Sequence, residues 1–135
     1  FRAASGTNIM TKNNNLKILM VEDDEAQSFM YKIEFKNFGL NLEVINDGEG
    51  VFDKIAKMKP DLILLDLLIG RVSGLDVLKE IKAKDETKDI KVIIMSNYNK
   101  KGLSEECINS GAMDYWVKSD YVPRQIVEKV KVIIN

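Results

Sequence analysis

The chain has 135 residues, of which 45% are hydrophobic and 30% are charged, and its formal net charge is −1. This length and composition predict one soluble globular domain with a single hydrophobic core. The charge excludes an overall basic field that would draw the chain onto nucleic acid or an anionic membrane, so we expect neither as a partner. A local basic patch is still compatible with this charge. No apolar run is long enough to span a bilayer.

Two residue types set limits on the chemistry. The sequence has no histidine, which excludes His–metal sites, Ser–His–Asp and Cys–His catalysis, and a phosphohistidine within the chain. A metal ion would therefore be held mainly by oxygen ligands, which favours Mg²⁺ over Zn²⁺. The single cysteine, Cys107, cannot form an internal disulfide. This fits a reducing compartment, and we expect a cytoplasmic protein.

Residues 1–15 differ from the rest of the chain. They are mostly polar, lack periodicity and do not begin with Met. We interpret them as a tag remnant or N-terminal tail, with a native start near Met10. The domain itself is then expected to occupy residues 16–135.

Five segments have the apolar character of β-strands. They are residues 16–21, 41–45, 61–66, 90–95 and 115–117. The runs 61–66 and 90–95 are almost continuously apolar, which is typical of central strands that are covered on both faces. The run 41–45 alternates between polar and apolar residues, as a more exposed strand does.

Helical periodicity fills the segments between and after these strands. The predicted helices are residues 26–38, 48–58, 73–84, 104–110 and 122–134, with Ser73 as a candidate N-cap. The first helix places Phe29, Met30, Ile33 and Phe38 near one face, which we expect to pack against the sheet. Repeated alternation of strand and helix predicts a doubly wound α/β fold with a five-stranded parallel sheet and right-handed crossovers.

Polar and charged side chains follow the predicted strands at their carboxyl ends, where ligands bind in sheets of this kind. Glu22 and Asp23 follow the first strand, and Asp66 ends the third. Ser96 follows the fourth strand, and Lys118 follows the fifth. Carboxylates that are held close together repel one another unless a cation intervenes, and a hard divalent cation such as Mg²⁺ suits oxygen ligands.

This set of residues suits transfer of a phosphoryl group to a carboxylate. Asp66 is then the nucleophile, and Mg²⁺ held by the acidic residues neutralises charge on the phosphoryl oxygens. Lys118 and Ser96 would contact the other oxygens. Each residue also has a simpler interpretation. The acidic run can cap the following helix, Ser96 can form a turn, and Lys118 can be a solvated lysine.

Four stretches of the sequence carry a family resemblance. They are residues 18–24 (ILMVEDD), 60–66 (PDLILLD), 92–96 (VIIMS) and 111–118 (GAMDYWVK). In this order they resemble the response-regulator receiver domains of two-component signalling, including the chemotaxis-regulator type, over about residues 16–134. The resemblance implies a flavodoxin-like fold with five helices and the strand order 2-1-3-4-5.

The resemblance also implies a role for each residue at the strand ends. The implied Mg²⁺ ligands are Glu22, Asp23, Asp66 and the backbone carbonyl of Leu68. Asp66 would accept a phosphoryl group from a sensor histidine kinase or phosphotransfer protein, with Lys118 and Ser96 as catalytic helpers. The domain would not be an enzyme with a separate substrate, but it would catalyse its own Mg²⁺-dependent phosphorylation and dephosphorylation.

The output is expected on the surface formed by the fourth helix, the fifth strand and the last helix. The resemblance implies that phosphorylation would draw Ser96 inward and let Tyr115 fill the vacated space, as in a two-state switch. We expect this surface to include Lys100, Lys101 and Trp116. It would bind a partner, control an output domain, or form a homodimer with a second copy of the chain.

Three features depart from or extend the family pattern. Gly70 stands where receivers usually have proline, which predicts a looser loop after the third strand. Ser119 follows Lys118 where proline is usual, and a cis bond without proline costs roughly 2.5–4 kcal/mol. The sequence leaves open whether this bond is cis or trans. Leu68 and Tyr98 flank the expected path of attacking water, and neither has an acidic or amide group. This predicts slow loss of phosphate.

Three other functions fit parts of the sequence. A haloacid-dehalogenase-type phosphatase would have a second aspartate where Leu68 stands, and a cap domain that this length does not accommodate. A nucleotide-binding flavodoxin or Rossmann module would have a glycine-rich loop where the acidic residues 22–24 stand. A degenerate receiver that only binds partners would lack metal-dependent phosphorylation, which is the observation that distinguishes it.

Overall fold

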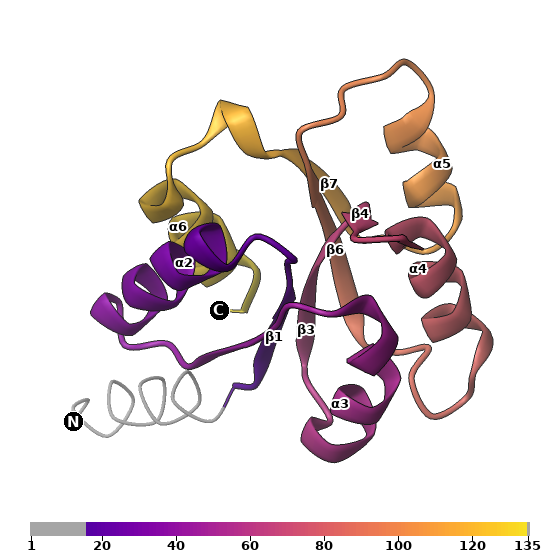
Figure 1. Ribbon diagram of the computed structural model, residues 1–135, viewed down its shortest axis with the longest axis horizontal. Helices are drawn as coiled ribbons and strands as arrows, with labels where there is room; N and C mark the ends of the chain where they lie inside the picture. The colour runs from indigo at the N-terminus through magenta and orange to yellow at the C-terminus, as the bar shows by residue number, and fades with distance from the viewer. Residues whose placement is uncertain (1–15, 135) are drawn as a thin grey trace, which may run out of the picture.

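A parallel sheet forms the centre of the molecule, with helices on both of its faces (Figure 1). The computed structural model describes residues 16–134, so the predicted tail of residues 1–15 lies outside the described residues. The strands of the sheet are β1 (Ile18–Val21), β2 (Leu42–Ile45), β3 (Leu62–Asp66), β6 (Lys91–Ser96) and β7 (Asp114–Val117). Their order is β2-β1-β3-β6-β7, with parallel pairing throughout, which confirms the predicted order 2-1-3-4-5.

Five α-helices accompany these strands within residues 16–134, as predicted. They are α2 (Glu25–Asn37), α3 (Val51–Met58), α4 (Gly74–Ala83), α5 (Leu103–Asn109) and α6 (Pro123–Ile134). Short 3₁₀ helices, Gly48–Gly50 and Lys118–Asp120, precede α3 and α6. Helices α2 and α6 cover one face of the sheet, and α3, α4 and α5 cover the other (Figure 1). Within the described residues, no helix is both long enough and apolar enough to cross a membrane.

Alternate residues of each central strand point to opposite faces, so the sheet has a hydrophobic core on either side. On β3, Ile63 and Leu65 pack with α3, α4 and α5, whereas Leu62 and Leu64 pack beneath α2 and α6. Each of these side chains is at most 1% exposed. Burying one of them contributes roughly 1.5–3 kcal/mol. The strand is therefore held firmly on both faces, which fixes the position of its last residue, Asp66.

Helix α2 is rotated relative to the prediction, so the predicted apolar face was wrong. The exposed side chains are Phe29 (63%), Met30 (53%) and Ile33 (44%). Tyr31 and Phe35 are buried instead, and of the predicted set only Phe38 packs against the core. The physical reason is that α2 has apolar residues on more than one side, so its periodicity does not single out a face. Tyr31 and Phe35 lie one turn apart and make the larger contact with the sheet.

The segment after β3 forms a short hairpin rather than the looser loop that was predicted. Strands β4 (Leu68–Ile69) and β5 (Val72–Ser73) pair antiparallel, and Gly70 at the turn has a φ of 60°. Gly74 follows the hairpin, and a Cβ atom at this position would lie 2.0 Å from the carbonyl oxygen of Asp66. Only glycine fits so close to the backbone, so the hairpin is held against the end of β3.

Candidate functional site

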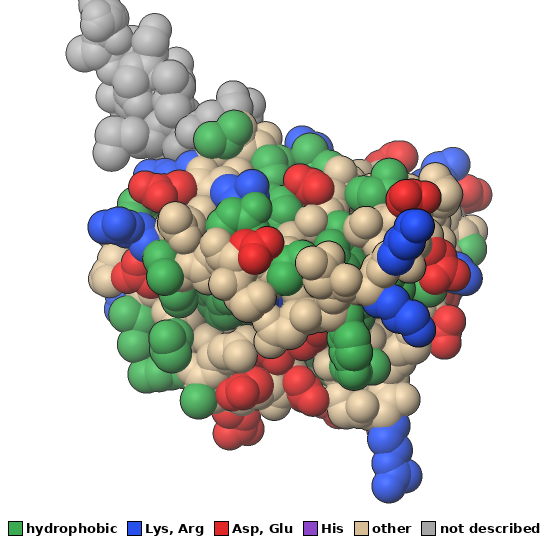
Figure 2. Space-filling view, turned by 90° about the horizontal axis from the view of Figure 1, so that it is seen from above, with side chains coloured by type: hydrophobic (Ala, Val, Ile, Leu, Met, Phe, Trp, Pro, Cys, Tyr) green, Lys and Arg blue, Asp and Glu red, His purple; other side chains and the backbone are tan. Residues whose placement is uncertain are grey.

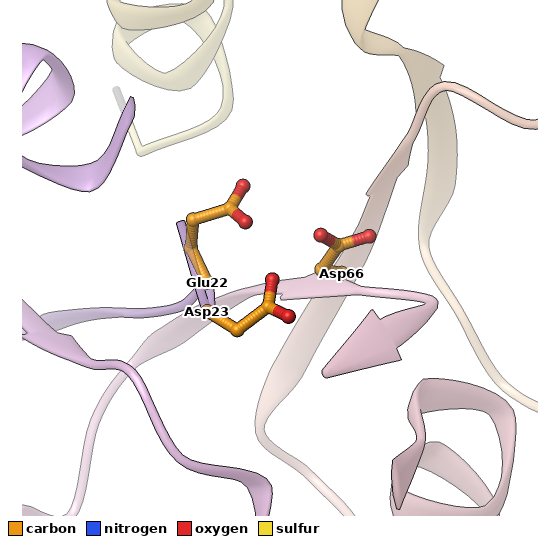
Figure 3. Close-up of side chains that lie close together, drawn as sticks. All are labelled: Glu22, Asp23 and Asp66. Atoms are coloured by element: carbon orange, nitrogen blue, oxygen red, sulfur yellow. The ribbon is translucent and has the colours of Figure 1, made fainter. Parts of the chain in front are cut away.

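The acidic side chains predicted from the sequence lie together at the carboxyl edge of the sheet (Figure 3). Val21 of β1 pairs with Leu65 of β3, so the residues that follow them, Glu22 and Asp66, come side by side. Asp23 projects toward the same space, and one carboxylate oxygen from each of the three acidic residues lies within 4.8 Å of the others. Glu22 is buried, Asp23 is exposed, and Asp66 is intermediate.

Lys118 reaches into this acidic cluster from the end of β7. Its Nζ atom donates hydrogen bonds to Oδ2 of Asp66 at 2.9 Å and to Oε1 of Glu22. A further hydrogen bond goes to Oε1 of Gln27 at 3.3 Å. The side chain of Lys118 is only 9% exposed. The bond between Lys118 and Ser119, which the sequence left open, is trans, because the described residues contain no cis peptide bond.

Burial and neighbouring charges shift the pKa values of Glu22 and Lys118 in opposite directions. Burial raises the pKa of the Glu22 carboxyl above its usual value, against the opposing effect of Lys118. For Lys118, burial lowers the pKa, but the hydrogen bonds to Glu22 and Asp66 outweigh it and the net pKa is raised. Lys118 therefore stays protonated at neutral pH, and a fixed positive charge lies beside the acidic group.

The donor set fits a hard divalent cation, because it consists of carboxylate oxygens that converge on one space. The neighbouring hairpin is tied to this set. The amide of Gly70 donates to Oδ2 of Asp23 at 3.0 Å, and the amide of Leu68 donates to Oδ1 of Asp66 at 3.4 Å. Leu68 thus lies beside the cluster, and the role of its carbonyl as a metal ligand stays a prediction.

Ser96 and Tyr115, the predicted switch pair, are connected through the loop after β6. Ser96 is 1% exposed, and its Oγ atom accepts a hydrogen bond from the amide of Tyr98 at 3.0 Å. The hydroxyl of Tyr115 donates to the backbone carbonyl of the same Tyr98. Burial raises the pKa of Tyr115, which keeps its hydroxyl protonated as a donor. Both residues of the predicted switch pair are thus hydrogen-bonded to Tyr98.

One residue assigned to the output surface is in fact part of the core. Trp116 is 3% exposed and packs beneath α6, and its Nε1 atom donates to Oδ2 of Asp114 at 2.9 Å. Strand residues alternate in direction, and Trp116 points to the α6 side of the sheet, whereas Tyr115 points toward α5. Lys100 and Lys101 are exposed, as predicted.

Gln27 is the residue of the site that sequence reasoning missed. It lies in the first turn of α2 and is separated from Lys118 by 91 positions. A glutamine in a first helical turn is ordinary, so no local pattern marks it. Only the position of Lys118 in the folded chain gives its side chain a partner.

The chain is similar to known response regulators and their receiver domains. The family model described as "Response regulator receiver domain" matches residues 18–131. Sporulation initiation phosphotransferase F of Bacillus subtilis is 33% identical over 104 residues, covering 77% of this chain and 82% of that protein. Transcriptional regulatory protein ZraR of Escherichia coli (strain K12) is 30% identical over 106 residues, covering 78% of this chain but 24% of that protein.

The chain therefore spans about a quarter of the length of regulators such as ZraR. Among solved structures, the Mn(2+)-bound form of response regulator Rcp1 has a TM-score of 0.74 and 25% sequence identity, covering 86% of this chain and 91% of that chain. The matched region contains the sheet, the acidic cluster and Lys118. The chain belongs to the response regulator receiver domain family of two-component systems.

Proposed function

We propose that the chain accepts a phosphoryl group on Asp66 in a Mg²⁺-dependent reaction. The observation that carries this proposal is the position of the Asp66 carboxylate, which lies within 4.8 Å of two further carboxylates and 2.9 Å from the ammonium group of Lys118. A nucleophile, ligands for a divalent cation and a separate positive charge thus meet at the carboxyl edge of the sheet.

The proposed metal site consists of Glu22, Asp23, Asp66 and the backbone carbonyl of Leu68. A bound Mg²⁺ would supply positive charge to offset that of the phosphoryl oxygens. The solved structure of the relative Rcp1 is a Mn(2+)-bound form, which supports the proposal that this chain binds a divalent cation.

In the proposed reaction, one carboxylate oxygen of Asp66 attacks the phosphorus atom of the donor, and the bond from phosphorus to the donor's leaving atom breaks. Lys118 and Ser96 stabilise the phosphoryl oxygens by donating hydrogen bonds. Attack of water on the resulting acyl phosphate releases phosphate and restores the carboxylate. The chain thereby catalyses its own modification and its reversal, and it turns over no separate substrate.

The phosphodonor we propose is a sensor histidine kinase or a phosphotransfer protein. These 135 residues contain no histidine, so a phosphohistidine donor must lie outside this sequence. Exposed apolar side chains near the site support contact with a protein. Met30 lines both the cavity that contains Lys118 and a neighbouring groove with Ile33 and Val122. Figure 2 shows hydrophobic side chains at the surface on the side of α2 and α6 (left).

The donor surface and the chemical site can be tested separately. Ile33→Glu should slow transfer from a phosphorylated histidine kinase or phosphotransfer protein, because it places a charge in the apolar contact. The same variant should react with acetyl phosphate as the unmodified chain does, because Ile33 does not contact the acidic cluster. Equal loss with both donors would count against a docking role for α2.

For the output, we propose that phosphorylation shifts the surface formed by α5, β7 and α6. The hydrogen bonds that connect Ser96, Tyr98 and Tyr115 support this proposal, because they link the phosphate-binding serine to β7. The shifted surface would engage a partner or a second copy of the chain. Light scattering with and without Mg²⁺ and beryllofluoride would show whether a dimer forms.

The central experiment measures the intact mass of the protein after incubation with acetyl phosphate. We expect the mass of one added phosphoryl group in the presence of Mg²⁺ and none after chelation with EDTA. Asp66→Asn should abolish the addition. Asp61→Asn is the matched control, because Asp61 lies just before the same strand and its carboxylate accepts a hydrogen bond from the amide of Lys17, at the opposite edge of the sheet. An unlabelled wild-type chain would identify a degenerate receiver and overturn the proposal.

A further inference from the structure

Lys118 is held by a third acceptor that lies outside the acidic cluster. An ammonium group has three N–H donors, and Lys118 directs them to Glu22, Asp66 and Gln27. Because an ammonium group cannot accept, the amide of Gln27 must present its oxygen, Oε1, at 3.3 Å. The three acceptors together satisfy a charged group that is only 9% exposed.

Two of these acceptors change during the reaction on Asp66, and this inference rests on that proposed function. A divalent cation bound to Glu22 and Asp66 would compete with Lys118 for the negative charge of these two carboxylates. Phosphorylation then converts the Asp66 carboxylate into a carbonyl and an ester-like oxygen, so the carboxyl group loses its own charge. Gln27 is neutral and is not part of the acidic cluster, so its oxygen is the acceptor that the reaction leaves unchanged.

Lys118 also borders a cavity, on the side of Gln27. Lys118 and Gln27 line a cavity of about 330 Å³ between α2, the loop after β6 and the start of α6, together with Tyr31 and Asn97. A water molecule takes up roughly 30 Å³ of liquid, so the cavity can hold several waters that would hydrate an ammonium group. When the carboxylates hold Lys118 less tightly, this cavity competes for its flexible side chain.

Hydrogen bonds fix the position of Gln27 relative to the acidic residues. Its backbone amide donates to Oδ1 of Asp24 at 3.0 Å, and the amide of Asp24 donates to Oε2 of Glu22 at 3.2 Å. Asp24 is the N-cap of α2, so the first turn of this helix is fixed to the loop that carries Glu22. The backbone of Gln27 is therefore fixed, and its side chain extends from there to Lys118.

We propose that Gln27 is a positioning residue, which keeps the ammonium group of Lys118 directed at the phosphoryl oxygens on Asp66 and out of the neighbouring cavity. It touches neither the phosphoryl group nor the metal. Its contribution should therefore appear when a phosphoryl group or its mimic is bound, and should be absent from metal binding alone.

The test uses Gln27→Leu, which removes the amide and keeps a side chain of similar size. Beryllofluoride serves as the phosphoryl mimic, and its binding in Mg²⁺ is followed by the fluorescence of Trp116, the one tryptophan of the chain. Loss of one hydrogen bond to a charged group predicts about tenfold weaker binding. Mg²⁺ affinity without beryllofluoride should stay within about twofold, because Gln27 is not a metal ligand.

A second readout observes Lys118 directly. In the beryllofluoride complex, the ¹⁵Nζ–H signal of Lys118 should be visible in the wild type and should be lost in Gln27→Leu through faster exchange with water. Gln27→Glu, which keeps an acceptor oxygen, should restore both the signal and the affinity. Asn37→Leu is the matched control, because it makes the same exchange of amide for leucine on α2, where the side-chain amide of Asn37 donates to Glu34 and not to the site.

The outcomes separate this inference from the function on which it rests. A wild-type chain that binds no beryllofluoride contradicts phosphorylation at Asp66. A wild-type chain that binds it, together with Gln27→Leu that binds equally well and keeps the Lys118 signal, contradicts only the role of Gln27. An equal effect of Asn37→Leu also overturns the inference, because the effect would then come from helix stability.

Discussion

Leu65 and Asp66 are neighbours on β3, yet they lie in regions where different forces dominate. Leu65 is fully buried among apolar side chains from α3, α4 and α5. Asp66 lies at the carboxyl edge, where carboxylates of like charge meet within 4.8 Å and Lys118 partly offsets their repulsion. Burial of apolar side chains therefore stabilises the interior of the sheet. At the edge, the fold holds together carboxylates that would move apart in water because their charges repel.

This contrast shows how the fold makes the chemistry available. Like charges stay together at the edge only because the strands that carry them are fixed on both faces by the core. Substitutions in the interior should thus act on stability, and substitutions at the edge should act on phosphorylation.

The largest effect is expected for Leu65→Ala, which removes fully buried apolar volume. We expect a loss of roughly 2–5 kcal/mol in the free energy of unfolding, from lost burial and the cavity that remains. Urea denaturation measures it. Leu68→Ala is the control, because Leu68 is 49% exposed and should lose less than about 0.5 kcal/mol. Similar losses for both leucines would contradict the division between interior and edge.

Gly74→Ala lies on the boundary between the two regions. A Cβ atom at this position would be 2.0 Å from the carbonyl oxygen of Asp66, and backbone cannot move aside as a flexible side chain can. We expect a loss of roughly 1–3 kcal/mol in stability and, because Asp66 is displaced, slower labelling by acetyl phosphate. Gly39→Ala lacks this clash, although alanine would be strained at the φ of 77° that Gly39 adopts. It should therefore leave labelling unchanged, and slow labelling in both variants would argue against displacement of Asp66.

Leu68 and Tyr98 test the edge without disturbing the interior. Both side chains are about half exposed, and neither has an acidic or amide group to orient water. Leu68→Asn together with Tyr98→Glu should speed loss of phosphate at least roughly tenfold, by providing groups that bind and activate water. The decay of the phosphorylated protein after removal of acetyl phosphate gives this rate. An unchanged rate would show that these positions do not control access of water.

The smallest effect on stability is expected for Asp66→Asn. This substitution removes one of the repelling carboxylates and one partner of Lys118, and Lys118 keeps its bond to Glu22. The two changes oppose each other, so we expect the free energy of unfolding to change by less than about 1 kcal/mol. Thermal denaturation of the two proteins side by side measures the difference. A loss as large as that of Leu65→Ala would mean that Asp66 is mainly a structural residue.

The fold could be predicted because its signals are local. Apolar runs such as residues 61–66 identify central strands, and their alternation with helices determines the topology. The acidic cluster and Lys118 could be predicted because parallel strands end at a common edge. The face of α2 could not, because apolar residues such as Phe29 and Tyr31 lie on different sides of the helix and only contact with the sheet decides between them.

Other features depend on contacts between distant segments. The contact of Gln27 with Lys118 requires the folded positions of α2 and β7. The hairpin after β3 was predicted as a looser loop from Gly70, because the sequence alone does not show that this turn pairs two short strands. The prediction that Trp116 lies on the output surface is wrong for the same reason. Side chains alternate along β7, so Trp116 points toward α6 because Tyr115 points to the other face.

The most direct test of the central claim locates the phosphoryl group on the chain. After labelling with acetyl phosphate and Mg²⁺, borohydride reduces an aspartyl phosphate to homoserine, and peptide mass spectrometry identifies the residue. Phosphorylation of Asp66 predicts homoserine at position 66 and unmodified Glu22, Asp23 and Ser96. Modification at any of those three residues, or no homoserine in a protein that gains the mass of a phosphoryl group, would contradict it.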